Sequence, residues 1–89
     1  MKAVMTVIGK DMVGILAKVS TACAAHNANV TDVTQSVLQD LFSMIMLVDI
    51  SRLDCDFSVF AGTLNTLGEE LGLSIHTMHE DIFNSMHRI

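Results

Sequence analysis

The amino-acid sequence predicts an α+β fold, a two-layer sandwich in which two helices cover one face of a four-stranded antiparallel sheet. The apolar residues change their spacing along the chain in the order β-α-β-β-α-β. The 89 residues have the length of one domain, and 51% of them are hydrophobic, which is enough for a packed core. We therefore expect residues 1–89 to form one domain, with a core over about residues 1–80 and a short tail at residues 81–89.

The first three elements follow from residue type and spacing. Val, Ile and Thr are frequent in residues 2–8, which predicts a strand. Apolar residues then recur at helical spacing over residues 12–26, and Asp11 is well placed to cap this helix. Residues 27–29 end the helix, and the Val- and Thr-rich residues 30–37 predict the second strand.

The same criteria predict the remaining elements: a hairpin turn at residues 38–40, a strand at 41–50, a helix at 57–71, a strand at 73–79 and helical turns at 81–89. Asp54 or Asp56 can cap the helix at its start, and Gly72 suits its C-terminal end. This order of elements is that of the ferredoxin-like fold.

Both faces of the predicted sheet are apolar. A sheet with helices on one face and water on the other normally alternates apolar and polar residues. Two strands depart from this rule. In residues 41–50 one side carries Phe42, Met44, Met46, Val48 and Ile50, and the other side carries Leu41, Ile45 and Leu47. In residues 2–8 one side carries Val4 and Ile8, and the other side carries Ala3, Met5 and Val7. Because a monomer would expose a larger apolar patch than is usual, we expect a homodimer or higher oligomer, with the tail covering part of the sheet.

Charge and composition exclude several classes of partner. The net charge of −5 disfavours binding to nucleic acids and anionic membranes. All four aromatic residues are Phe, and none lies in a basic stretch that would stack RNA bases. No apolar run reaches the roughly 18 residues that span a bilayer, and the N-terminus has no signal-peptide pattern. We expect a cytoplasmic protein.

The cysteines and histidines are interpreted as structural. Cys23 falls on the apolar face of the first predicted helix, and Cys55 lies between two Asp residues that raise a thiol pKa. A disulfide between the two cysteines is the alternative, although a reducing compartment suits the chain better. His76 and His79 are three residues apart on a strand, so they point to opposite faces and cannot bind one metal ion there. A bend at Glu80 that brings His79 to His87 is the alternative. We expect no metal, no cofactor and no catalytic residue.

The stretch from Gly9 to Leu16 is the most site-like part of the sequence. It is a polar turn with glycines between a predicted strand and the start of a predicted helix. Unpaired backbone N–H groups at a helix start can hold an anion, and glycine lets another group approach closely. The spacing is neither that of a P-loop nor that of a dinucleotide-binding loop. On composition alone, the same stretch also fits a simple capped helix start.

Two motifs together resemble the ACT domain family. They are Gly9-x-Asp11-x-x-Gly14-Ile15-Leu16 after the first strand and His26-Asn27-Ala28-Asn29-Val30 at the start of the second. The resemblance covers about residues 1–80, and with its tail the chain looks like the small stand-alone ACT proteins of bacteria and archaea. It implies a non-catalytic regulatory module that binds an amino acid or a similar metabolite between two subunits and signals to a regulated protein partner.

The resemblance also implies a role for each site residue. Asp11 takes the place of a polar residue that holds the amino group of the ligand. Met12, Val13 and Gly14 would offer backbone groups to the ligand carboxylate. Asn29 matches an asparagine that faces the ligand from the neighbouring subunit.

The chain departs from the better-known ACT sites at two positions. Gly9 stands where some members have a polar side chain, and Val13 stands where many have proline. A protein–protein interaction module without a small ligand is therefore the alternative function, with the apolar sheet face and the seven methionines forming its surface. A small enzyme such as an acylphosphatase would need an anion-binding Arg in the first turn, where only Lys10 is present.

Overall fold

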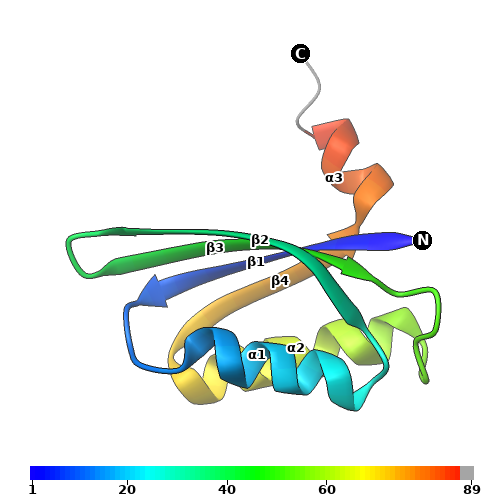
Figure 1. Ribbon diagram of the computed structural model, residues 1–89, viewed down its shortest axis with the longest axis horizontal. Helices are drawn as coiled ribbons and strands as arrows, with labels where there is room; N and C mark the ends of the chain where they lie inside the picture. The colour runs from blue at the N-terminus through cyan, green and yellow to red at the C-terminus, as the bar shows by residue number, and fades with distance from the viewer. Residues whose placement is uncertain (87–89) are drawn as a thin grey trace.

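The computed structural model describes residues 1–86 and has the predicted order of elements. These are β1 (Lys2–Lys10), α1 (Ile15–Ala25), β2 (Asn29–Leu38), β3 (Leu41–Asp49), α2 (Phe57–Leu71), β4 (Leu73–His79) and α3 (Glu80–Met86). The strands form one antiparallel sheet in the order β2-β3-β1-β4, and α1 and α2 lie side by side on one face (Figure 1). The predicted two-layer, ferredoxin-like fold is confirmed, and so is a helical tail as far as Met86.

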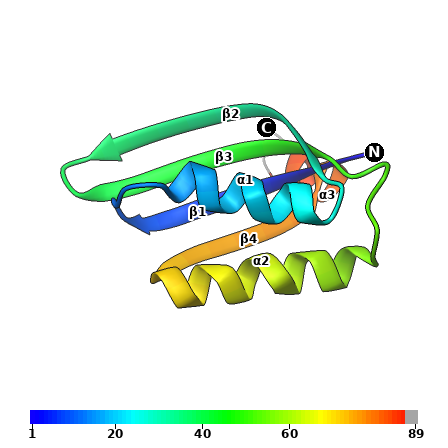
Figure 2. The same ribbon diagram turned by 60° about the horizontal axis from the view of Figure 1, so that its bottom comes forward.

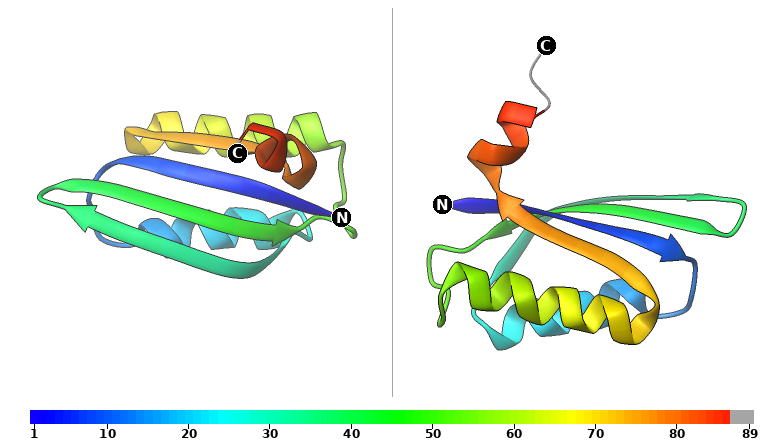
Figure 3. Two further views of the ribbon diagram at one scale, coloured as in Figure 1. Left: turned by 90° about the horizontal axis from the view of Figure 1, so that it is seen from above. Right: turned by 180° about the vertical axis from the view of Figure 1, so that it is seen from behind.

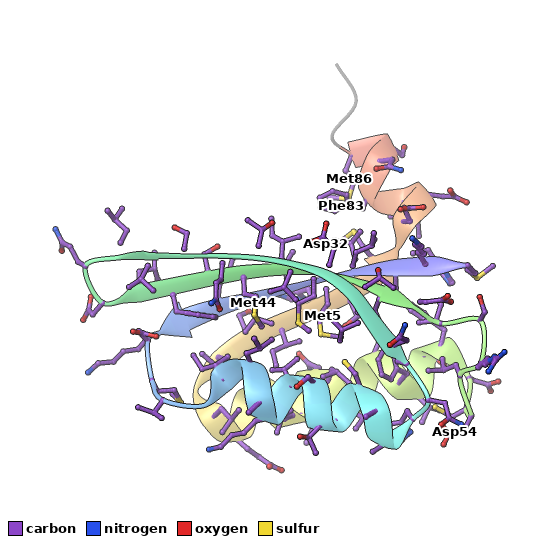
Figure 4. The ribbon with its side chains drawn as sticks, viewed as in Figure 1. Met5, Asp32, Met44, Asp54, Phe83 and Met86 are labelled. Carbon is purple, nitrogen blue, oxygen red and sulfur yellow. The ribbon has the colours of Figure 1, made fainter. Side chains whose placement is uncertain are left out.

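The core lies between the sheet and the two long helices (Figure 2). Every second residue of β3 is buried there: Phe42, Met44, Met46 and Val48. This confirms the two-sided pattern predicted for residues 41–50. Met5 and Met44 are fully buried, and Figure 4 shows their side chains between the sheet and the helices. Complete burial of such a side chain contributes about 1.5–3 kcal/mol, and the flexible thioether fills irregular gaps.

The opposite face of the sheet is only partly covered. Here α3 contacts β1 and β4 near the N-terminus (Figure 3), and Val4 on this outer face is 5% exposed. Farther along the same face, Ile8, Leu41 and Ile45 are 46%, 49% and 45% exposed. The tail therefore covers one end of the apolar face, and the other end remains open in the single chain.

The start of α1 differs from the prediction. The helix begins at Ile15 instead of Met12, and its N-cap is Gly14, which has the left-handed conformation φ 85°, ψ 14° with no side-chain capping bond. A left-handed residue cannot be part of a right-handed helix, so Gly14 sets the boundary. The prediction that Asp11 caps the helix is wrong, because its backbone N–H donates to the carbonyl oxygen of Asp40 at 2.8 Å and Asp11 continues from β1.

The ends of α2 agree better with the prediction. Asp56 is the N-cap residue, although its side chain makes no capping hydrogen bond. Gly72 ends the helix in the left-handed conformation, φ 73°, and its N–H donates to the carbonyl oxygens of Gly68 and Glu69 in the last turn. Within residues 1–86, no helix is long and apolar enough to span a membrane.

Candidate functional site

A groove of about 470 Å³ lies beside the loop that joins β1 to α1. Its lining comes from three parts of the chain: Asp11, Met12 and Gly14 of the loop with Ile15, Leu16 and Ala17 of α1, then Gln35, Ser36 and Val37 of β2, and Phe42 of β3. Three of the predicted site residues, Asp11, Met12 and Gly14, therefore line one groove. Val13 does not line it, and its side chain is 97% exposed.

The first residues of α1, which line the groove, have free backbone N–H groups. The first hydrogen bond of the helix runs from the Lys18 N–H to the Gly14 carbonyl oxygen, at 3.0 Å. The N–H groups of Ile15, Leu16 and Ala17 consequently have no acceptor inside the helix. The helix begins three residues later than its apolar spacing indicates, so these donors directly follow Met12, Val13 and Gly14. That the backbone of Met12, Val13 and Gly14 binds a ligand carboxylate stays a prediction.

Asn29 lies at the other end of the sheet. It pairs with Asp49, the last residue of β3, whereas Asp11 bonds to Asp40, which directly precedes β3. The length of β3 separates the two ends by about 26 Å, at roughly 3.3 Å per residue. Within one chain, Asp11 and Asn29 cannot contact the same small ligand.

A second groove, of about 310 Å³, surrounds Asn29 and is lined by Asn27, Asn29, Asp49, Ser51 and Arg52. The Asp49 carboxylate accepts a hydrogen bond from the Ser51 N–H at 2.9 Å. Hydrogen bonds from Ser51 lower the pKa of Asp49. This end of the sheet thus presents an amide, a carboxylate and a guanidinium to solvent.

The histidines of the last strand are separated as predicted. The His79 ring stacks on Phe57 with ring centroids 4.1 Å apart, and His76 lies on the other face, where its Nε2 is 3.2 Å from the Ser74 hydroxyl oxygen. His87 lies outside the described residues, so the bend that would join it to His79 stays a prediction.

The thiols also agree with the prediction. Both are free, and burial raises the pKa of Cys23 to about 11. The pKa of Cys55 is raised by burial first, and then by its hydrogen bond to Asp54 and by the charges of Asp54 and Asp56. Neither cysteine has the lowered pKa of a nucleophilic thiolate.

One cluster escaped the sequence analysis. His26, Asp54 and Cys55 offer ligand atoms that all lie within 4.8 Å of one another. Because 28 residues separate His26 from Asp54, neither helical nor strand spacing could predict that the two side chains meet. Only the packing of the end of α1 against the loop before α2 shows it.

Comparison with known proteins gives consistent matches. The sequence pattern of the ACT domain family matches residues 2–78. A UPF0237 protein of Methanopyrus kandleri is 48% identical over 88 residues, 99% of this chain and 98% of the relative. A UPF0237 protein of Listeria innocua is 46% identical over 89 residues, the full length of both chains. The solved structure of an ACT domain protein from Streptococcus pneumoniae is similar with a TM-score of 0.81 and 36% identity, over 93% of each chain.

Proposed function

Because the chain belongs to the ACT domain family, we propose that it is a regulatory module that binds an amino acid or a similar small metabolite between two copies of itself. ACT domains generally serve as regulatory, ligand-binding modules. The observation that carries the proposal is the groove at the start of α1, which is lined by Asp11 and by three residues whose backbone N–H groups have no acceptor inside the helix.

The groove complements the two charged ends of an amino acid. The Asp11 carboxylate is an acceptor for the ammonium group. The N–H groups of Ile15, Leu16 and Ala17, at the positive end of the helix dipole, are donors for the carboxylate. The volume of about 470 Å³ falls in the range of small-molecule sites, and the apolar side chains of the lining suit a ligand side chain.

A second copy would complete this site. The strand β2 is at the edge of the sheet, so one side of its backbone has no partner strand within the chain. Antiparallel pairing of two β2 strands about a twofold axis at Thr34 would place Asn29 of one copy opposite Leu38 of the other, because the β-bulge between Val30 and Asp32 shortens the strand by one residue. Asn29 of the second copy would then lie next to Val37, which lines the groove.

Such a site gives a mechanism for regulation without catalysis. A ligand held by both copies binds the paired arrangement better than any other, so it shifts the population towards that arrangement. A protein partner that recognises only the paired arrangement would then respond to the metabolite.

A thermal-shift screen of the purified chain against the amino acids tests ligand binding. We expect at least one amino acid to raise the Tm, because a ligand at 100 times its Kd stabilises the folded state by about 2.7 kcal/mol. Asp11→Ala and Asn29→Ala should each abolish the shift. Asn65→Ala and Glu70→Ala, at exposed positions of α2, are controls and should retain it. An unchanged Tm with every amino acid would contradict the proposal for this ligand class.

Mixing the two variants tests whether the site is shared. A dimer of one Asp11→Ala chain and one Asn29→Ala chain carries both substitutions in one site and none in the other. After unfolding and refolding an equimolar mixture, calorimetry should recover binding in about a quarter of the sites. No recovery, although heterodimers form, would show that Asp11 and Asn29 act in separate places.

The outer sheet face favours a second candidate function, binding of another protein without a small ligand. Ile8, Leu41 and Ile45 remain about half exposed there. This candidate predicts no thermal shift with any amino acid, and loss of partner binding in the variant Ile45→Lys.

A further inference from the structure

We propose that His26, Asp54 and Cys55 form a binding site for a divalent transition-metal ion, with the chemistry of Zn²⁺ as the best match. The cluster lies where α1 ends and where the loop before α2 passes it, at the Asp54 label of Figure 4. It shares no residue with the groove at the start of α1.

The fold holds the His26 side chain in place beside the loop that carries Asp54 and Cys55. His26 is the C-cap residue of α1, and its carbonyl oxygen accepts a hydrogen bond from the Asp54 N–H at 3.2 Å. The rings of His26 and the buried Phe60 form a T-shaped contact, with centroids 6.0 Å apart and planes at 76°. Backbone pairing and ring packing therefore fix the imidazole against the loop that carries Asp54 and Cys55.

Two separations between the ligand atoms are close to those around a tetrahedral ion. His26 Nδ1 lies 3.1 Å from Asp54 Oδ1 and 3.8 Å from Cys55 Sγ. Around a tetrahedral Zn²⁺, with bonds of about 2.1 Å to nitrogen or oxygen and 2.3 Å to sulfur, neighbouring ligand atoms lie about 3.4–3.6 Å apart. Shifts of a few tenths of an ångström would bring both separations to these values, and the third pair, Asp54 and Cys55, has its ligand atoms within 4.8 Å of each other.

The arrangement is that of a ligand set and not that of a catalytic relay. A Cys-His-Asp relay uses the two ring nitrogens separately, one facing the thiol and the other the carboxylate. Here the sulfur and the carboxylate oxygen both converge on Nδ1. A cation bound at the centre of the three atoms would satisfy all of them at once.

The types of ligand atom indicate which metal ion would bind. Thiolate and imidazole are ligands of zinc and other transition metals, whereas Ca²⁺ and Mg²⁺ prefer sets of oxygen atoms. The side chains of His26 and Asp54 are 27% and 44% exposed, so solvent can reach a fourth coordination position. The bound ion would link the end of α1 to the loop before α2.

Cobalt substitution tests the site in the full chain after treatment with a chelator. Titration with Co²⁺ should produce the sulfur-to-cobalt charge-transfer absorption and the intense visible bands of a tetrahedral site, saturating at one ion per chain. Zn²⁺ should displace the cobalt. Cys55→Ser should abolish the charge-transfer band, and His26→Gln and Asp54→Asn should each weaken Zn²⁺ binding at least about tenfold.

The chain offers a matched control for each ligand. Cys23→Ala, His76→Gln and Asp40→Asn remove the same chemical groups outside the cluster and should leave the spectrum and the affinity unchanged. Circular dichroism verifies the fold of every variant. A charge-transfer band that persists in Cys55→Ser, a loss of affinity as large in His76→Gln, or no band with the natural sequence would overturn the proposal. The natural sequence would then contain only a His26–Asp54 hydrogen bond with a thiol beside it.

Discussion

Asp49 is a carboxylate whose ionised form the fold stabilises. Two contacts with Ser51, through its side chain and its backbone N–H, lower the pKa of Asp49. A folded-state pKa below the unfolded value of about 3.9 means that the contribution to stability is present above that pH. It is lost as the pH falls through the folded-state pKa.

We therefore predict that Asp49→Asn destabilises the protein at pH 6 and has a smaller effect at pH 3. Asparagine cannot supply the charge that Ser51 stabilises, and at pH 3 the natural carboxylate loses part of its own charge. Urea unfolding of both proteins at the two pH values measures the difference. An effect of equal size at both would contradict this account of the contact.

At the scale of elements, the close packing of α2 on β4 depends on a missing side chain. A Cβ added at Gly68 would lie 2.8 Å from the Leu73 carbonyl oxygen and 2.8 Å from Ile75 Cγ1. A Cβ added at Gly62, on the same helix, would meet nothing within 4 Å. The two glycines thus differ in what they do, although both lie inside a helix.

Alanine substitutions should separate the two glycines. Gly68→Ala should lower the free energy of unfolding by about 1–3 kcal/mol, because the helix must move away from β4. Gly62→Ala should raise it by about 0.5–1 kcal/mol, because alanine favours a helix interior. Denaturant unfolding measures both. Similar effects from the two variants would show that the packing at Gly68 relaxes without cost.

The elements also show how far local sequence patterns reach. Alternation along residues 41–50 predicted both faces of β3, and Gly72 predicted the end of α2. The start of α1 was predicted one turn too early, because Met12 continues the apolar spacing of the helix. Spacing alone cannot show that Gly14 takes the left-handed conformation that stops the helix from extending backwards.

For the whole molecule, the shared site requires a dimer, and Thr34 lies close to the proposed axis. We predict that sedimentation equilibrium finds a dimer at micromolar concentration. Thr34→Lys should raise the dimer dissociation constant up to about fivefold at low salt and less at high salt, because two like charges would face each other. Thr66→Lys, exposed on α2, should leave it unchanged.

Two outcomes would contradict this arrangement in different ways. A monomer at micromolar concentration would exclude the dimer and the shared site together. A dimer that is insensitive to Thr34→Lys would instead place the interface elsewhere, for example on the open part of the outer sheet face around Ile45.

The sequence by itself determined the elements, their order and the faces of the strands, because each depends on residues a few positions apart. It also predicted Asp11 and Gly14 as neighbours in one loop. Only the tertiary structure decided that Asp11 and Asn29 lie at opposite ends of the sheet, and that His26 meets Asp54 and Cys55. Strand register and the packing of the helices set these distances, and both arise from contacts between residues far apart in the chain, which no local period encodes.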